Sequence, residues 1–140
     1  MAAFRPLPNR PKEPAMLAQH DCSAIVAVAD LDRARAFYRD MLGLGLTREG
    51  GAEGVLVFQS GATRLIVYRS EFAGTNRANA LVWGAGDGFD AIVAELEAKG
   101  VAFEHYPDIG RLENNVHHAG GAKLAWFKDP DGNILHVNSM

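Results

Sequence analysis

Two stretches of this 140-residue chain follow one pattern, and that repetition constrains the fold more than any other feature. Residues 58–70 align without a gap on residues 127–139, with phenylalanine and serine at the matching ends and an apolar strand in the same register. Nearer the start of each half, Asp32 and Asp90 occupy matching places in two helix-like segments. Because such self-similarity marks a duplicated structural unit, we expect two modules built alike.

The first half predicts the element order β-α-β-β-β. Residues 23–29 form an apolar run of strand length. Asp30 is a suitable N-cap, apolar residues recur at helical spacing as far as Leu42, and Gly43 ends the helix. Glycine-rich turns then separate three segments of strand-like composition, at residues 44–48, 54–59 and 63–69.

The same order returns after a polar linker at residues 70–79. Residues 80–83 predict a strand, and Asp87 can cap a helix that ends at Gly100. Three more strands are expected at residues 101–106, 123–128 and 134–138, with a long polar loop at 107–121 and a hairpin turn at 129–133. The fold class is therefore α+β, one domain over residues 21–140 with modules at about 21–70 and 79–140.

Residues 1–20 differ from the rest of the chain. Four of the six prolines fall here, together with several basic residues, and no apolar run follows them. This composition predicts a flexible, proline-rich arm rather than a secretory signal. Met16 opens a more ordinary N-terminus, so Met1 and Met16 both remain candidate natural starts.

Charge and cysteine content exclude several classes of partner. The net charge is −3 and no Lys/Arg run stands out, so nucleic acid and anionic membrane are not expected partners. No apolar run has the length of a membrane span. The single cysteine, Cys22, rules out an internal disulfide and indicates a reducing compartment, for which we expect the cytoplasm.

Two motifs resemble those of a known family. Residues 28–44 (VADLDRARAFYRDMLGL) and 126–135 (WFKDPDGNIL) are similar to the opening and closing signatures of the vicinal oxygen chelate superfamily, which includes glyoxalase I, bleomycin-resistance proteins and extradiol dioxygenases. The resemblance covers residues 23–139. It implies tandem βαβββ modules whose mixed sheets curl around a cavity, often completed by a second chain in a homodimer.

The resemblance also implies four metal-ligand positions, one on the first and one on the last strand of each module. Carried onto this chain through the repeat, they fall on Ser23, Val67, Leu81 and His136. A catalytic divalent ion needs about three good protein ligands, and only the imidazole is one. A register error of one residue would not supply more, because the neighbours are Ala80, Val82, Ile66 and Tyr68. The sequence therefore predicts no metal and no other cofactor.

The remaining histidines and the cavity wall leave the chemistry open. His117 and His118 lie in the predicted long loop, where solvated histidines are common, and their role stays undecided. Strand alternation puts His136 opposite Leu135 and Val137, so it faces the cavity if those two pack on the helices. The expected lining is mostly apolar and aromatic and comprises Ser23, Ile25, Phe58, Val67, Arg69, Leu81, Trp83, Phe127 and His136.

Such a lining suits a small organic ligand with a planar or anionic group, although each residue could equally belong to an ordinary core. One hypothesis is therefore a metal-independent binding protein of the glyoxalase/bleomycin-resistance type. The alternative is an enzyme, either a glyoxalase-like lyase or dioxygenase with atypical metal ligands or a metal-free catalyst that uses His136 as an acid or base.

Overall fold

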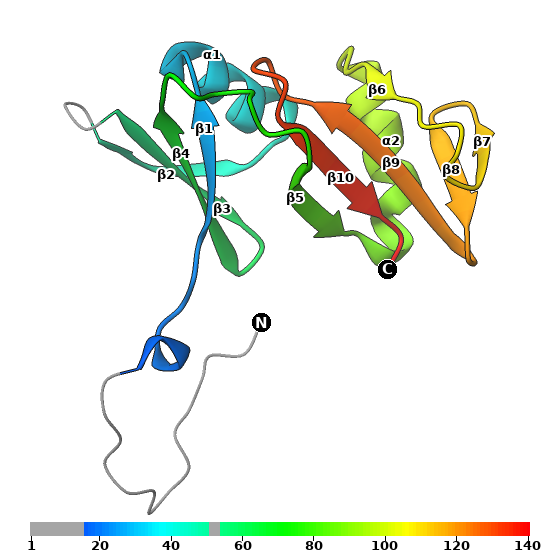
Figure 1. Cartoon of the computed structure of the whole chain (residues 1–140), viewed down its shortest axis with the longest axis horizontal. Coiled ribbons are helices and arrows are strands. Elements are labelled where there is room, and N and C mark those ends of the chain that lie inside the picture. The colour runs from blue at the N-terminus through cyan, green and yellow to red at the C-terminus, as the bar shows by residue number, and fades with distance from the viewer. Residues whose placement is uncertain (1–15, 51–53) are drawn as a thin grey trace, which may run out of the picture.

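Two sheets, each with its own helical layer, form the part of the chain that this computed structural model describes, residues 16–50 and 54–140 (Figure 1). The predicted arm falls largely outside these ranges. Its described end contains one short 3-10 turn, η1 (Leu17–Gln19). Within the two described ranges, no helix is long and apolar enough to cross a membrane.

The first module has the predicted order of elements. β1 (Ala24–Val28) leads into α1 (Leu31–Arg35), which continues as the π-helical segment η2 (Ala36–Met41); β2 (Gly45–Gly50), β3 (Val55–Ser60) and β4 (Thr63–Arg69) follow. The Asp30 carboxylate accepts a hydrogen bond from the Arg33 amide at 3.1 Å, so it caps α1 as expected. The strand order is β1-β4-β3-β2, with β1 parallel to β4 and the other pairs antiparallel.

The second module keeps this plan and enlarges it. Its elements are β5 (Asn79–Gly84), the 3-10 turn η3 (Gly86–Gly88), α2 (Phe89–Ala98), β6 (Phe103–Glu104), β7 (Arg111–Glu113), β8 (Val116–Ala119), β9 (Ala122–Lys128) and β10 (Ile134–Asn138). The strand order is β5-β10-β9-β8-β7, with β6 also paired to β9. The predicted N-cap, Asp87, lies inside η3, and α2 begins after Gly88 without a side-chain cap.

The prediction of a long loop at 107–121 is wrong, because this segment contains the β7–β8 hairpin. Asn114 closes its tight turn with a φ of 56°, a left-handed conformation that asparagine tolerates better than most residues. β8 then pairs with one end of β9 and leaves only the other end for β6. That competition explains why β6 is much shorter than the predicted strand at 101–106.

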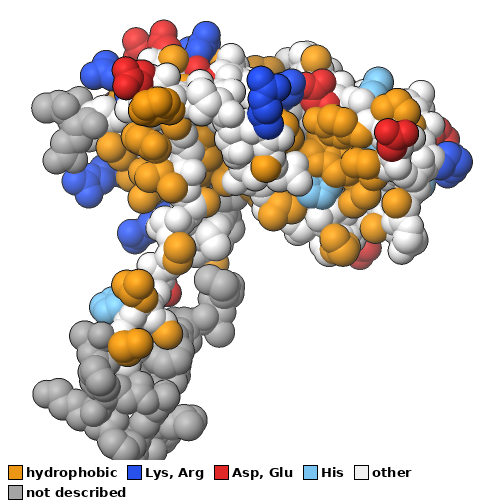
Figure 2. All heavy atoms as spheres, viewed as in Figure 1, with side chains coloured by type: hydrophobic (Ala, Val, Ile, Leu, Met, Phe, Trp, Pro, Cys, Tyr) orange, Lys and Arg blue, Asp and Glu red, His pale blue; other side chains and the backbone are white. Residues whose placement is uncertain are grey.

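One face of each sheet packs against helix, and the other face has no helix on it within the described residues, although His117, Trp126 and His136 on that face of the second sheet are buried. The core side is an apolar cluster that includes Val67, Phe58, Phe89, Phe127 and Leu135. We call the opposite side of each sheet its open face. Ile25 is 60% exposed there in the first module and Val82 is 61% exposed in the second. Figure 2 shows hydrophobic side chains gathered over both sheets on the same side of the molecule.

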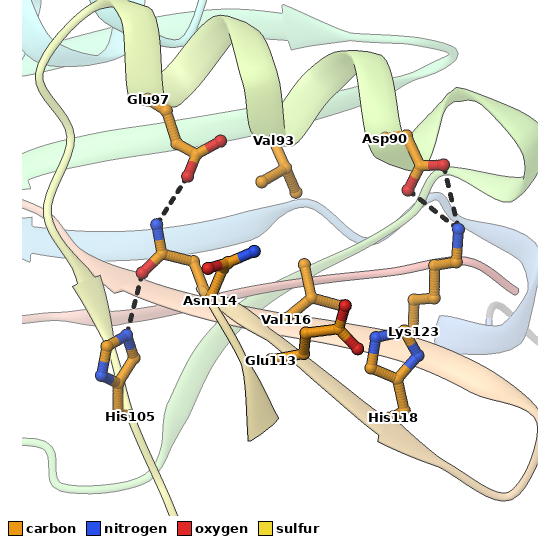
Figure 3. A pocket seen from close by; sticks show the side chains of 10 residues that line it. Asp90, Val93, Glu97, His105, Glu113, Asn114, Val116, His118 and Lys123 are labelled. Atoms are coloured by element: carbon orange, nitrogen blue, oxygen red, sulfur yellow. Dashed lines mark hydrogen bonds and ion pairs between the residues drawn. The ribbon is translucent and has the colours of Figure 1, made fainter. Parts of the chain in front are cut away.

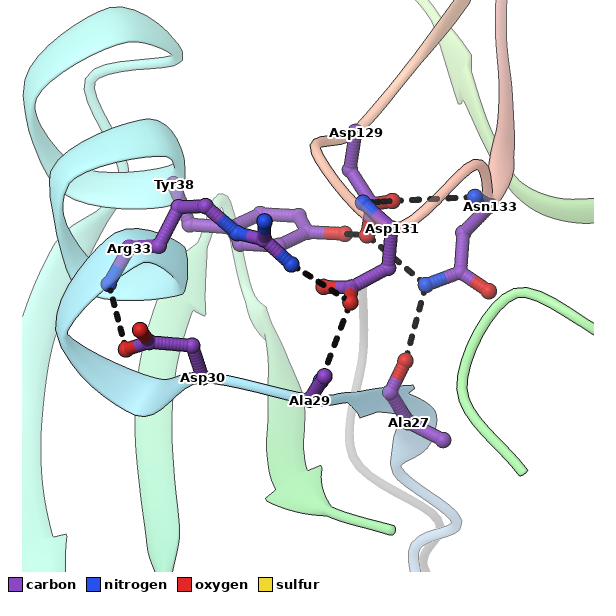
Figure 4. A network of polar contacts seen from close by, with 8 residues as sticks. All are labelled: Ala27, Ala29, Asp30, Arg33, Tyr38, Asp129, Asp131 and Asn133. Carbon is purple, nitrogen blue, oxygen red and sulfur yellow. Dashed lines mark hydrogen bonds and ion pairs between the residues drawn. The ribbon is translucent and has the colours of Figure 1, made fainter. Parts of the chain in front are cut away.

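The β9–β10 turn joins the two modules through a buried carboxylate (Figure 4). Asp129, only 4% exposed, accepts a 2.7 Å hydrogen bond from the Tyr38 hydroxyl of η2. It also accepts hydrogen bonds from the Asn133 side-chain amide at 2.8 Å and from the backbone amides of Asp131 and Asn133. Asn133 in turn donates to the Ala27 carbonyl of β1 at 2.8 Å. The predicted hairpin turn is confirmed, and it also makes a buried polar contact between the modules.

A second carboxylate of the same turn extends this contact. Asp131 accepts hydrogen bonds from the Ala29 amide at 3.0 Å and from the Arg33 guanidinium at 2.8 Å. The linker between the modules crosses directly over the turn at Gly74, whose φ is 75°. A Cβ at Gly74 would lie 2.0 Å from the Asp131 carbonyl oxygen, so only glycine fits this crossing. These contacts fix the positions of the two open faces relative to each other.

Candidate functional site

The nine residues predicted to line one cavity lie on two sides of the sheets. Five of them, Phe58, Val67, Leu81, Trp83 and Phe127, are on the core side, where their strand partners are buried residues. Ile25 and His136 are on the open faces. Ser23 precedes β1, and Arg69 lies exposed at the end of β4 beside Gly54. The prediction that these nine residues share a lining is therefore wrong.

For Val67, the error comes from the hairpins of the two modules. Phe58 pairs with Leu65 in the first module, and the equivalent Phe127 pairs with Leu135 in the second. The chain segment that joins the paired residues is therefore one residue longer in the second hairpin. A gapless alignment of the repeat slips by one residue at this point. One residue of slip exchanges the two faces of a strand, which moved Val67 from the core to the expected cavity.

The strand pairing also relocates the four family ligand positions. His136 pairs with Val82 in the second module, and Ile66 pairs with Ile25 in the first. Ile66 is therefore the repeat equivalent of His136, and Ala80 that of Ser23. The corrected set, Ser23, Ile66, Ala80 and His136, contains a single strong ligand. Among the described residues, moreover, no group of three His, Cys, Asp or Glu side chains is arranged to hold a metal. The residues do not fit a divalent ion.

A row of four rings crosses the open face of the second sheet and was not predicted. We call Tyr106, His117, Trp126 and His136 the ring row. Trp126 stacks on His136 with ring centroids 4.4 Å apart and an interplanar angle of 21°. On its other side, Trp126 meets His117 edge-on at 5.0 Å and Tyr106 edge-on at 5.3 Å. The usable sequence signal was the hairpin register, which places Trp126 directly opposite His136.

His136 is held in one tautomer. Its Nδ1 lies 3.0 Å from the Ala125 carbonyl, which can only accept, so Nδ1 carries the hydrogen. Its Nε2 is then an acceptor and lies 3.3 Å from the side-chain nitrogen of Asn138. The Met140 amide donates to the Asn138 oxygen at 3.1 Å and fixes the orientation of that side chain. Burial lowers the pKa of His136 and its bond to Ala125 partly opposes this, so the ring is neutral at neutral pH.

His117 is a second neutral imidazole on the same face. Its side chain is fully buried, and Nε2 accepts a 2.9 Å hydrogen bond from the Tyr106 amide, so Nδ1 carries the hydrogen. That nitrogen has no hydrogen-bond partner within the described ranges, although the Leu124 carbonyl lies near enough to stabilise a charged ring. Burial is the dominant influence and lowers the pKa of His117.

The two buried imidazoles make stability depend on pH. Their pKa values are lowered in the folded protein, so below the ordinary value of about 6.5 the unfolded chain binds protons that the folded chain does not. We expect the free energy of unfolding to fall as pH drops from 7.5 to 5.5. Urea unfolding at several pH values measures this, and His136→Gln should flatten the dependence because glutamine does not titrate. A stability that rose over the same interval would contradict it.

Among the hollows of the described residues, two on the core side of the sheets contain residues singled out from the sequence, and both lie away from the ring row. The larger, about 500 Å³, separates α2 from the β7–β8 hairpin (Figure 3). Asp90 pairs with Lys123 at one end, and Asn115 bridges Glu97 and His105 at the other. His118 lines this hollow, so the two adjacent histidines of β8 point to opposite sides. Polar pairs within the lining thus occupy both ends of the hollow, and we do not take it as the primary site.

The smaller hollow, about 270 Å³, lies between the modules and is mostly apolar. Trp83 and Phe127, which the sequence placed in a ligand cavity, line it together with Leu42, Leu44 and Ser60. The indole nitrogen of Trp83 donates to the Ser60 hydroxyl at 2.9 Å. These two aromatic residues thus hold the modules together rather than facing the ring row.

Comparisons with known proteins agree with this architecture. A family model described as Glyoxalase/Bleomycin resistance protein/Dioxygenase superfamily matches residues 20–137. No curated protein sequence matches the chain significantly.

Several solved structures share the fold at low sequence identity. A lactoylglutathione lyase from Agrobacterium tumefaciens is 20% identical, with a TM-score of 0.65 over 85% of this chain and 92% of that one. The fosfomycin resistance protein FosX from Mesorhizobium loti is 14% identical, with a TM-score of 0.62 over 87% and 92%. The oxidase ChaP-H2 is 23% identical, with a TM-score of 0.61 over 83% and 89%. At these identities the likeness concerns the fold alone.

Proposed function

The chain belongs to the glyoxalase/bleomycin resistance protein/dioxygenase superfamily, and from that membership we propose that it binds a small organic molecule on the open faces of its sheets without a metal ion. One observation carries the proposal: of the four positions that would hold the metal, only His136 has a strong ligand. The other three residues, Ser23, Ile66 and Ala80, offer at most one hydroxyl. The exposed apolar side chains of both open faces supply the contact surface such a ligand needs.

We further propose that a second copy of the chain covers the open faces. Among the described residues, the two sheets do not close a barrel within one chain, and β1 and β5 have no strand partner on their outer edges. Ile25 and Val82 are both more than half exposed beside these edges, where an unpartnered apolar surface favours association. Sedimentation of the purified chain tests the homodimer, and a monomer at all concentrations would exclude it.

Metal independence has a direct test. Elemental analysis of the purified protein should find no stoichiometric metal, and divalent ions should not raise its melting temperature. A matched variant, Ser23→His with Ile66→Glu and Ala80→His, restores ligand types at the corrected positions. It should gain stability with added Zn²⁺ or Ni²⁺, by roughly 2.7 kcal/mol at 100 times the dissociation constant. Stoichiometric metal in the unaltered protein would overturn the proposal.

An enzymatic role is the second candidate, and the tautomer of His136 favours it. An unprotonated Nε2 on a neutral ring is able to take a proton from a bound substrate. Three proteins with the same fold are named as a lyase, a resistance protein and an oxidase, so this fold is used by enzymes as well. A His136→Gln variant that lost turnover but kept ligand affinity would support this second role.

We place the protein in the cytoplasm, in keeping with the free, exposed thiol of Cys22.

A further inference from the structure

The hydrogen-bonding state of His136 restricts the kind of molecule its face can recognise. Nδ1 is committed to the Ala125 carbonyl, so the only group this ring can offer a ligand is the Nε2 lone pair. A lone pair recognises a hydrogen-bond donor, such as a hydroxyl or an N–H group. It repels a carboxylate or phosphate oxygen, which has no hydrogen to donate.

The present partner of that lone pair is one a ligand can replace. The Asn138 amide nitrogen lies 3.3 Å away, at the long end of the range for a hydrogen bond. His136 and Asn138 are only 8% and 5% exposed, so a ligand hydroxyl reaches Nε2 by displacing the Asn138 amide nitrogen, and at a shorter distance it would form a better bond. Asn138 would keep its other contact, in which its oxygen accepts from the Met140 amide. Stacking on Trp126 holds the imidazole still during the exchange.

The surroundings of His136 favour an uncharged ligand. Its neighbours on the same face are Val82 on β5 and Trp126 on β9. One charged pair, Lys128 with Glu104, lies at the edge of this face, and its 2.8 Å contact neutralises both groups. An anionic ligand would thus lose its hydration beside Val82 and Trp126, next to a lysine that already has a carboxylate partner, which is costly.

We propose that His136 serves as a fixed hydrogen-bond acceptor at the position where the family carries a metal ligand, and that the protein selects an uncharged, largely apolar molecule with a hydroxyl donor, the phenols being the model class. This inference rests on the proposed function and narrows it to a ligand class. It keeps the planar group expected from the sequence and excludes the anionic one. Binding here involves no bond making or breaking, only an exchange of hydrogen-bond partners at Nε2.

The test compares two probes of nearly equal shape, p-cresol and its methyl ether 4-methylanisole. Both are titrated into the ¹⁵N-labelled full chain while the Trp126 indole N–H signal is followed. The chain has two tryptophans, so a Trp83→Phe variant assigns that signal. The ether cannot donate, and we expect p-cresol to bind roughly 5–10-fold more tightly, as one net hydrogen bond provides.

Two variants connect the preference to His136. His136→Phe keeps a flat ring against Trp126 and should bind both probes equally. Asn138→Ala removes the competing donor and should strengthen p-cresol binding without changing the affinity of the ether; this variant also serves if His136→Phe does not fold.

Three results would contradict the inference in distinguishable ways. Equal binding of both probes by the unaltered protein overturns the role of His136 and leaves ligand binding on the open face intact. A preference that persists in His136→Phe places the acceptor elsewhere. If neither probe shifts the Trp126 signal, binding of apolar molecules at this face fails, and the proposed function fails with it.

Discussion

Replacing Asp129 with alanine is expected to lower the free energy of unfolding by about 3–5 kcal/mol, the sum of the unsatisfied donors it leaves. The carboxylate is 4% exposed and accepts from Tyr38, from the Asn133 side chain and from two backbone amides. Its removal would leave several buried donors without an acceptor, and each unsatisfied donor costs about 1–3 kcal/mol before the turn relaxes. Urea unfolding followed by circular dichroism measures the loss.

Two companion variants show whether the loss arises at the junction between the modules. Tyr38→Phe deletes one hydrogen bond to a charged group and should cost about 1.5–3 kcal/mol. The double variant should lose less than the sum of the two, because both changes remove the same contact. Asp40→Ala removes an exposed carboxylate that pairs with Arg39 at the surface and should leave stability close to that of the unaltered protein. An Asp129→Ala protein as stable as Asp40→Ala would mean that the buried network does not hold the modules together.

The order of helices and strands could be predicted from the sequence because it depends on patterns of neighbouring residues. The repeat, the Asp30 cap and the glycine that ends the first helix all derive from contacts between residues near one another in the chain. By contrast, the junction depends on Tyr38 reaching Asp129 across the fold. Pro130 and Gly132 predicted the turn that begins at Asp129. No nearby residue indicated that the Asp129 carboxylate accepts a hydrogen bond from the Tyr38 hydroxyl.

The candidate site was harder to predict, because a strand has two faces and one residue of error exchanges them. A hairpin longer by one residue was enough to put Val67 in the expected cavity in place of Ile66. His117 was missed for another reason. Its short strand is framed by glycines and asparagines, which resemble a loop, and only pairing with β9 makes it regular structure. His136 was correctly placed on the face opposite Leu135 and Val137, since its own strand determines that alternation.

Replacing Phe127 with alanine should cost about 3–5 kcal/mol of unfolding free energy, the usual range for removing a buried phenylalanine. The ring is 2% exposed, contacts Phe103 with centroids 5.8 Å apart and packs on the core side of β9. The Phe127→Ala variant distinguishes two interpretations of the sequence, in which Phe127 either lines a ligand cavity or belongs to the core. A cavity-lining ring would be replaceable at little cost to stability, whereas a core ring leaves a void that the surrounding structure fills only in part.

Phe72, in the linker and 67% exposed, provides a matched control for the same chemical change. Phe72→Ala should alter stability by no more than about 0.5 kcal/mol, and Phe127→Leu, which nearly preserves volume, should cost less than about 1.5 kcal/mol. Urea unfolding of the three variants gives the comparison, with binding of p-cresol to each folded protein as the second measurement. If Phe127→Ala were as stable as Phe72→Ala yet lost p-cresol, the ligand would lie on the helix side of the sheet, and the assignment of the ring row to the binding face would be wrong.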